Sequence, residues 1–130
     1  VRTLPAIALL LGLAACGGSD EKADAQQTVR DFVQATNERD GERLCGELVT
    51  QQFKEQATGA TGERVDRICE RQLELTRGLK LDLLGVGRTK IDGERATVST
   101  RLDIDGVTAP RIFALEKEDG SWKLASGSSE

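Results

Sequence analysis

Apolar residues recur at helical spacing in the first half of the chain and alternate with polar residues in the second half. The first helical stripe begins near Asp24 and comprises Ala25, Val29, Phe32, Val33 and Thr36. The polar segment 37–41 ends this helix, and Asp40 within it is a suitable N-cap for a second helix. The inward stripe of that second helix is Leu44, Cys45, Leu48 and Val49.

A third helix is predicted for residues 63–77, with Gly78 as a natural stop after it. Its inner stripe includes Val65, Cys69 and Leu73. Residues 50–57 either continue the second helix or form a separate turn around Phe53, and residues 58–62 are a loop by composition.

After Gly78 the period becomes alternating, which predicts strands for residues 80–91, 94–104, 107–117 and 122–126. The sequences between them contain Asp-Gly, a hairpin-turn signal. In the second strand one side carries Ala96, Val98, Thr100, Leu102 and Ile104. Gly85 and Gly87 indicate a bulge or tight bend, and Pro110 indicates an edge or a bulge. This order predicts an α+β domain, with N-terminal helices packed on a curved antiparallel four-stranded meander.

The first fifteen residues have the layout of an export signal: Arg2, an apolar run, then small residues. The run is too short to span a bilayer, which takes about 20 apolar residues. The string Leu13-Ala14-Ala15-Cys16 resembles the bacterial lipobox, which implies cleavage before Cys16 and lipidation of its thiol. The expected organisation is a signal peptide (1–15), a lipidated cysteine and flexible tether (16–23), a folded domain (24–126) and a polar tail (127–130). The alternative is a buried N-terminal helix with a chance cysteine.

A lipidated Cys16 leaves Cys45 and Cys69 as an even pair. Outside the cytoplasm such a pair usually forms a disulfide, and both residues are predicted on inner helix stripes. The alternatives are two free buried thiols, or a metal pair that would be incomplete without histidine. The compartment favours the disulfide.

Composition narrows the possible chemistry. The net charge is −4, and −5 once the leader with Arg2 is removed, so binding to nucleic acid is not expected. Histidine and tyrosine are absent, which excludes Ser-His-Asp and Cys-His catalysis and the usual zinc sites. We therefore expect no cofactor, no metal and no catalytic residue.

A few charged residues are candidates for chemistry. Asp103 and Asp105 are spaced like paired carboxylates, and Asp82 lies on the preceding strand, but all three fit solvated faces and turns. Arg88 and Arg111 are single cations on strands, which either hold an anion inside a cavity or lie at the surface, and the surface is favoured. The segment 85–88 resembles a phosphate loop only superficially, because no helix follows it.

The capped helices joined by residues 37–41, and a meander that ends in Asp119-Gly120-Ser121-Trp122-Lys123-Leu124, resemble the NTF2-like (cystatin-like) cone fold. The resemblance covers residues 24–126 and implies a bent sheet around a conical pocket. The residues that would line this pocket are Phe32, Val98, Leu102, Ile104 and Trp122, although for Trp122 a place in the core is favoured. The chain departs from the family pattern between residues 50 and 62, where no room remains for the hairpin that many members have.

These observations predict a membrane-tethered lipoprotein on the extracytoplasmic face of a cell membrane. Its domain is expected to be a non-catalytic binding module of the cell envelope for a protein or a small apolar ligand. The alternative is a small cyclase- or isomerase-like enzyme that uses a pocket carboxylate.

Overall fold

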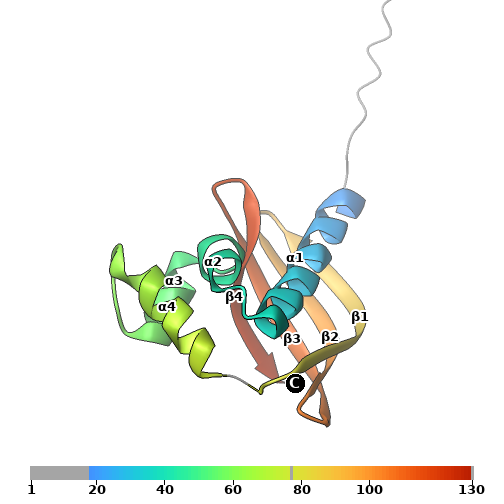
Figure 1. The fold of residues 1–130 in the computed structure, drawn as a ribbon. Helices are drawn as coiled ribbons and strands as arrows, with labels where there is room; N and C mark the ends of the chain where they lie inside the picture. The colour runs from blue at the N-terminus through green and yellow to red at the C-terminus, as the bar shows by residue number, and fades with distance from the viewer. Residues whose placement is uncertain (1–17, 77, 130) are drawn as a thin grey trace, which may run out of the picture.

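The computed structural model describes residues 18–76 and 78–129. Within these residues the helical segments come first: α1 (Gly18–Glu38), α2 (Gly41–Arg43), the π-helical η1 (Leu44–Leu48), α3 (Gln51–Thr58) and α4 (Arg64–Leu75). The strands follow: β1 (Leu81–Asp92), β2 (Arg95–Ile104), β3 (Val107–Glu118) and β4 (Ser121–Ser129). Figure 1 shows α1 lying across the curved sheet, with the shorter helices grouped beside it.

The strands form an antiparallel four-stranded sheet in the order β1-β2-β3-β4. The register of β1 against β2 shifts between Leu83 and Gly85 and again between Val86 and Thr89. These irregularities fall at Gly85 and Gly87, as the sequence predicted, and bulges of this kind bend a sheet. The fold class is therefore the predicted one: helices packed on an open, curved meander.

The main core lies between α1 and the inner face of the sheet. Val29 from α1 and Val98 from β2 are fully buried, and Leu115 and Leu124 are almost so. The alternation predicted for β2 is confirmed from Ala96 to Leu102, whose inward residues are buried while Arg95, Thr97 and Arg101 are exposed, and Ile104 at the end of the strand is half-buried. Each such Val or Leu stabilises the fold by about 1.5–3 kcal/mol.

The first helix begins at Gly18, earlier than the predicted start near Asp24. Residues 18–23, expected in a flexible tether, are therefore helical. Glu21 in this added segment contacts Lys117 and Trp122, which lie about a hundred residues further along the chain. Residues 1–17, with the predicted signal peptide and Cys16, lie outside the described residues.

The far end of α1 is fixed to the start of the sheet. The Asn37 side-chain amide donates to the Leu81 carbonyl (2.7 Å) and accepts from the Leu81 N–H (2.8 Å). Arg39, which follows the helix with a φ of 57°, donates to the carbonyl oxygens of Thr36, Thr76 and Leu79. Contacts at both ends thus hold α1 on the sheet.

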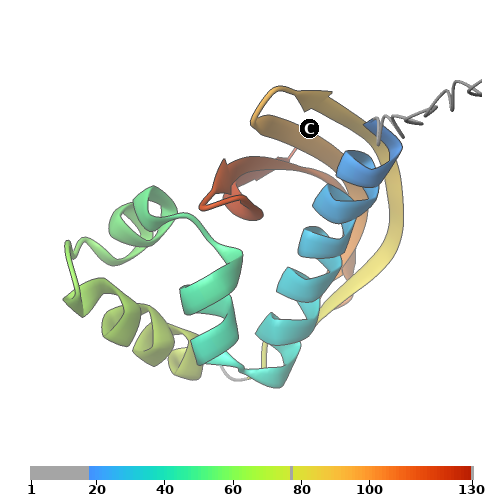
Figure 2. The ribbon, with the colours of Figure 1, turned by 90° about the horizontal axis from the view of Figure 1, so that it is seen from above.

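Residues 41–76 form a helical lobe that shares a small core with α1: Leu44, Cys45, Leu48 and Leu73 of the lobe pack with Ala35 of α1. Asp40 caps its first helix by accepting from the Arg43 N–H, as predicted. Thr50 caps α3, so residues 51–58 are a separate helix. The predicted disulfide between Cys45 and Cys69 is present, with 6.0 Å between the two Cα atoms. Figure 2, from above, shows α2 and η1 next to the end of α1, with α3 and α4 further away.

The last strand is longer than predicted. Residues 127–129, expected in a polar tail, pair with residues 111–113 of β3. Polar side chains do not prevent backbone pairing, and Gly127 is suited to its place because a Cβ there would lie 3.3 Å from the Phe113 ring. Pro110 lies in β3 one residue beyond the last pair with β4, at the end of that strand contact.

No helix among the described residues is long and apolar enough to cross a membrane.

Candidate functional site

A cleft of about 570 Å³ lies between the first turns of α1, the segment 43–48 and the β3–β4 turn. Figure 2 shows the β3–β4 hairpin between α1 and the helical lobe, where this cleft is found. Three parts of the chain that are distant in sequence therefore build one hollow.

The walls of the cleft are charged. They carry six carboxylates and three cations: Glu21, Asp24, Asp31, Glu47, Glu118, Asp119, Arg43, Lys117 and Lys123. Every cation is paired with a wall carboxylate: Arg43 with Asp31 (3.3 Å), Lys117 with Glu21 (2.8 Å) and Lys123 with Glu118 (3.6 Å). In the described part of the chain, no ion pair engages Asp24, Glu47 or Asp119. The cleft thus presents three free carboxylates on walls that ion pairs hold in place.

Leu48 and Trp122 provide the apolar part of the lining, and both are buried. The Trp122 indole N–H donates to Glu21 Oε2 at 2.9 Å. The Lys117 ammonium lies 5.2 Å from the centre of the Trp122 ring, a distance typical of cation–π contacts. Glu21, Lys117 and Trp122 therefore form a cluster that joins α1 to β3 and β4, which we call the N-terminal clamp.

Glu21 is the charged centre of the N-terminal clamp. The hydrogen bond from the Lys117 ammonium lowers the pKa of Glu21 below its ordinary value of 4.5, and the Trp122 N–H acts in the same direction. Desolvation opposes these effects but does not outweigh them. Glu21 is consequently ionised at neutral pH and acts as an acceptor rather than as a proton donor.

Of the residues predicted to line a conical pocket, Trp122 lies in the main core, as favoured from the sequence, and its surface also lines the cleft. The other four, Phe32, Val98, Leu102 and Ile104, pack in or against the main core. The Phe32 and Phe113 rings, with centroids 6.1 Å apart, pack between α1 and the sheet. Side chains of α1 thus occupy the inner face of the sheet at these positions.

The carboxylates considered for catalysis lie in turn contacts or at the surface. Asp103 accepts from the Gly106 N–H and the Thr108 hydroxyl, and so stabilises the β2–β3 turn. Asp105 accepts from the Lys80 N–H, and Asp82 is exposed opposite Asp103 on the neighbouring strand.

The two strand arginines differ in burial. Arg88 is exposed. Arg111 lies opposite Thr100 on the inner face, where its Nε is buried without a hydrogen-bond partner among the described residues. The same part of the chain contains no group of three potential metal ligands.

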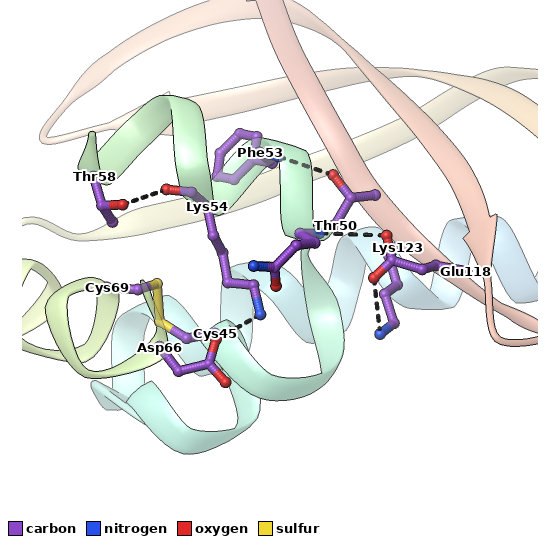
Figure 3. Close-up of polar contacts among 10 residues, drawn as sticks. Cys45, Thr50, Phe53, Lys54, Thr58, Asp66, Cys69, Glu118 and Lys123 are labelled. Carbon is purple, nitrogen blue, oxygen red and sulfur yellow. Dashed lines mark hydrogen bonds and ion pairs between the residues drawn. A yellow bond between two sulfur atoms is a disulfide. The ribbon is translucent and has the colours of Figure 1, made fainter. Parts of the chain in front are cut away.

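The helical lobe is fixed against the β3–β4 turn by polar contacts (Figure 3). The Thr50 N–H donates to the Leu124 carbonyl at 3.0 Å, and Glu118 accepts from the Gln51 N–H at 3.3 Å. Behind this junction the buried Lys54 ammonium lies 2.6 Å from Asp66 Oδ1, close to the disulfide (Figure 3). These contacts set the position of the cleft wall that Glu118 shares with Lys123.

Sequence reasoning missed Glu21, Lys54 and Asp66. The partners of Glu21 lie 96 and 101 residues away, so no local spacing indicates them. Lys54 and Asp66 lie on separate helices, and a lysine in a polar segment is ordinarily exposed.

Comparison with known proteins identifies the architecture. No protein-family model matches the chain, and no curated protein sequence matches it. Among solved structures, an uncharacterised protein with a cystatin-like fold from Caulobacter vibrioides aligns with a TM-score of 0.59. The alignment covers 82% of this chain and 87% of that one, at 16% identity. The chain has the NTF2-like, or cystatin-like, fold.

Two further structures support the same conclusion. An NTF2-like protein of unknown function from Shewanella oneidensis aligns with a TM-score of 0.57 at 15% identity, over 82% of this chain and 96% of that one. A Novosphingobium aromaticivorans protein named "Putative Scytalone Dehydratase" also aligns at 0.57 and 15% identity, over 86% and 89% of the two chains. At such identities the likeness shows the NTF2-like fold alone, because one fold serves many functions.

Proposed function

We propose that this protein is a non-catalytic binding module, anchored by a lipid on Cys16 to the extracytoplasmic face of a cell membrane, and that its ligand binds in the cleft. The lipobox-like string 13–16 supports the anchor. The Cys45–Cys69 disulfide supports an oxidising compartment, since such bonds are rare in the cytosol.

The main support for a binding role is that the side chains of the cleft walls are already ordered. Three ion pairs and the Trp122–Glu21 hydrogen bond hold the wall side chains in place. Walls that are already ordered lose less conformational entropy when a ligand binds. The volume of about 570 Å³ is within the range of small-molecule sites.

The lining also indicates the kind of ligand. Free carboxylates, backbone groups of the β3–β4 turn and the apolar surfaces of Leu48 and Trp122 favour a molecule with hydrogen-bond donors and an apolar part. This differs from the small apolar ligand expected from the sequence, because the inner sheet face that would hold such a ligand is covered by α1.

Binding is favoured over catalysis by the residues available. The chain has no histidine or tyrosine, and Cys45 and Cys69 are joined to each other. The carboxylates at the cleft are ion-paired or exposed, and Asp82 and Asp103 lie away from it. A general acid or base needs a titrating group positioned against the substrate.

Native mass spectrometry of protein purified from its host membrane tests the proposal. Gly46 lines the cleft, and a Cβ there would meet no atom within 4 Å, so Gly46→Leu should place a bulky side chain in part of the cleft while the fold is kept. Gly85→Leu is the matched control, because Gly85 is equally open but lies on β1 outside the cleft.

We expect a bound species on the wild-type protein and on Gly85→Leu, and we expect Gly46→Leu to bind it at least about tenfold more weakly, which corresponds to about 1.4 kcal/mol of binding free energy. Equal retention by Gly46→Leu would show that the ligand binds elsewhere.

A further inference from the structure

We propose that the end of the domain around the N-terminus of α1 rests directly on the bilayer, so that the rim of the cleft lies at the level of the lipid headgroups. This inference rests on the proposed lipid anchor at Cys16 and adds to it an interaction surface with a defined partner, a lipid surface. It contrasts with a domain that moves freely on a long tether.

Very little chain separates the proposed anchor from the folded domain. The helix begins at Gly18, so Gly17 alone separates it from Cys16. Two residues of extended chain reach at most about 7 Å. Had the fold begun near Asp24, as the sequence predicted, the reach would have been about 27 Å. A lipid on Cys16 therefore holds the folded domain against the surface.

The first turns of α1 are also held on the rest of the domain. The N-terminal clamp ties Glu21 to Lys117 at 2.8 Å and to Trp122 at 2.9 Å. These bonds fix the start of α1 to the end of β3 and the start of β4. The β3–β4 turn consequently stays close to the anchored residue, and the cleft that this turn borders stays there with it.

The surface that would meet the bilayer consists of turns at the end of the molecule where α1 begins. The β1–β2 and β3–β4 turns lie at the same end of the molecule as the N-terminal part of α1, and the β2–β3 turn lies at the opposite end (Figure 1). The start of α1, to which the lipidated Cys16 is joined through Gly17, thus has two hairpin turns at its end of the molecule, and we call these two turns the base.

The alternative is that α1 lies flat on the membrane. A helix that does so has an exposed apolar face that enters the lipid. The exposed positions of α1 include Asp24, Gln27, Arg30 and Gln34, all polar. The large exposed apolar residues of the described chain, Leu75, Leu84 and Val107, lie on three other elements. These features favour contact through the end of the domain.

The end of the domain with the β2–β3 turn is then distant from the bilayer. The 21 residues of α1 span about 31 Å. Asn37 at the end of α1 bonds to Leu81, and the Asp105 N–H donates to the Lys80 carbonyl at 3.1 Å, which places the β2–β3 turn there. Val107 at this turn is 70% exposed and offers a position for a distant reporter.

The charges of the proposed base are of both signs. Asp92, Glu94 and Arg95 lie at the β1–β2 turn, and Asp119 lies at the β3–β4 turn. A basic cluster that would attract anionic lipid is missing from these turns. The contact therefore depends on the covalent lipid, and we expect it to be the same on neutral and on anionic vesicles.

Trp122 is the one tryptophan of the sequence and a native reporter of this contact. The full-length protein, matured in a bacterial host, is reconstituted into phosphatidylcholine vesicles and into vesicles that also contain phosphatidylglycerol. Lipids with a nitroxide on the headgroup quench tryptophan fluorescence at short range. We expect strong quenching of Trp122 in both kinds of vesicle.

Two variants make the result specific. Insertion of about twelve Gly and Ser residues between Gly17 and Gly18 raises the mean reach of the tether to about 20 Å, and should lower the quenching at least about twofold. Val107→Trp adds a second tryptophan at the far end, whose added emission should not be quenched. Equal quenching with and without the insertion, or quenching of the Val107→Trp emission, would overturn the proposal.

Membrane fractionation separates this result from the proposed function. Cys16→Ser should move the protein to the soluble fraction, and a Cys16→Ser protein that stays with the membrane would refute the lipid anchor itself. If Cys16→Ser releases the protein but Trp122 of the anchored protein is not quenched, the anchor stands and the resting surface is wrong.

Discussion

The disulfide should contribute a large share of the stability, because it closes the segment that contains α3 and the first half of α4. Cys45 and Cys69 are 24 positions apart. In the chain-entropy treatment a loop of this length lowers the entropy of the unfolded state by about 12 cal/mol/K, which is about 3.5 kcal/mol at 25 °C. The double substitution Cys45→Ala and Cys69→Ala should lower the free energy of unfolding by about this amount.

The effect should be felt most strongly in the helical lobe. The lobe contributes four buried residues to its small core, whereas the main core has twelve, so burial stabilises the lobe less. Equilibrium unfolding in urea, followed by circular dichroism, measures the global loss. Hydrogen exchange locates it, and we expect amide protection in α4 to fall more than in β2 and β3.

Reduced wild-type protein is the control, since it loses the cross-link but keeps both cysteine side chains. It should match the double variant within about 1 kcal/mol. A loss below about 1 kcal/mol in both proteins would refute the reasoning, because loop closure would then not limit the unfolded state. Equal exchange changes in α4 and β2 would refute the special dependence of the lobe.

Three further predictions concern the core, the N-terminal clamp and the buried ion pair. Leu102→Ala should lower the free energy of unfolding by about 2–4 kcal/mol, because burial is lost and a cavity forms. Arg101→Ala, at the exposed neighbouring position, should change it by no more than about 0.5 kcal/mol. Similar melting shifts for the two variants would contradict the inward orientation of Leu102. Because the folded pKa of Glu21 is below 4.5, its contribution is present above about that pH and is lost as the pH falls through the lowered value. The stability difference between wild type and Glu21→Gln, measured by urea unfolding, should therefore shrink below about pH 4.5, and a constant difference would exclude the ion pair as its source. Asp66→Ala should cost about 2 kcal/mol because it leaves the buried Lys54 ammonium unpaired, while Lys54→Met should change the stability by less than about 1 kcal/mol, and the reverse order in thermal melts would contradict this account.

The sequence predicted the features that repeat along the chain. The alternation in β2 identified its buried side because the side-chain period of a strand is two, and Leu102 and Arg101 fall where that period places them. Two cysteines on inner helix stripes were predicted to pair, and they do. Such inferences need only the periodic pattern within an element and the number of cysteines, without knowledge of the tertiary contacts.

The remaining features depend on contacts between distant residues. Local composition made residues 18–23 resemble a tether, but Glu21 binds Lys117 and Trp122 and so belongs to the folded domain. The pocket prediction likewise required knowledge of how closely α1 packs on the sheet. Phe32 meets Phe113 across that interface, and the open space lies instead beside Trp122.

The central claim is that the cleft between α1, η1 and the β3–β4 turn holds the ligand. The most direct test is a ¹H–¹⁵N NMR titration of residues 18–130 with the small-molecule fraction released when purified wild-type protein is denatured. We expect the shifted amides to cluster at Thr28, Gly46 and Gly120, which line the cleft. Shifts confined to Thr97 and Ser99 on the outer face of β2, with the cleft amides unchanged, would contradict it.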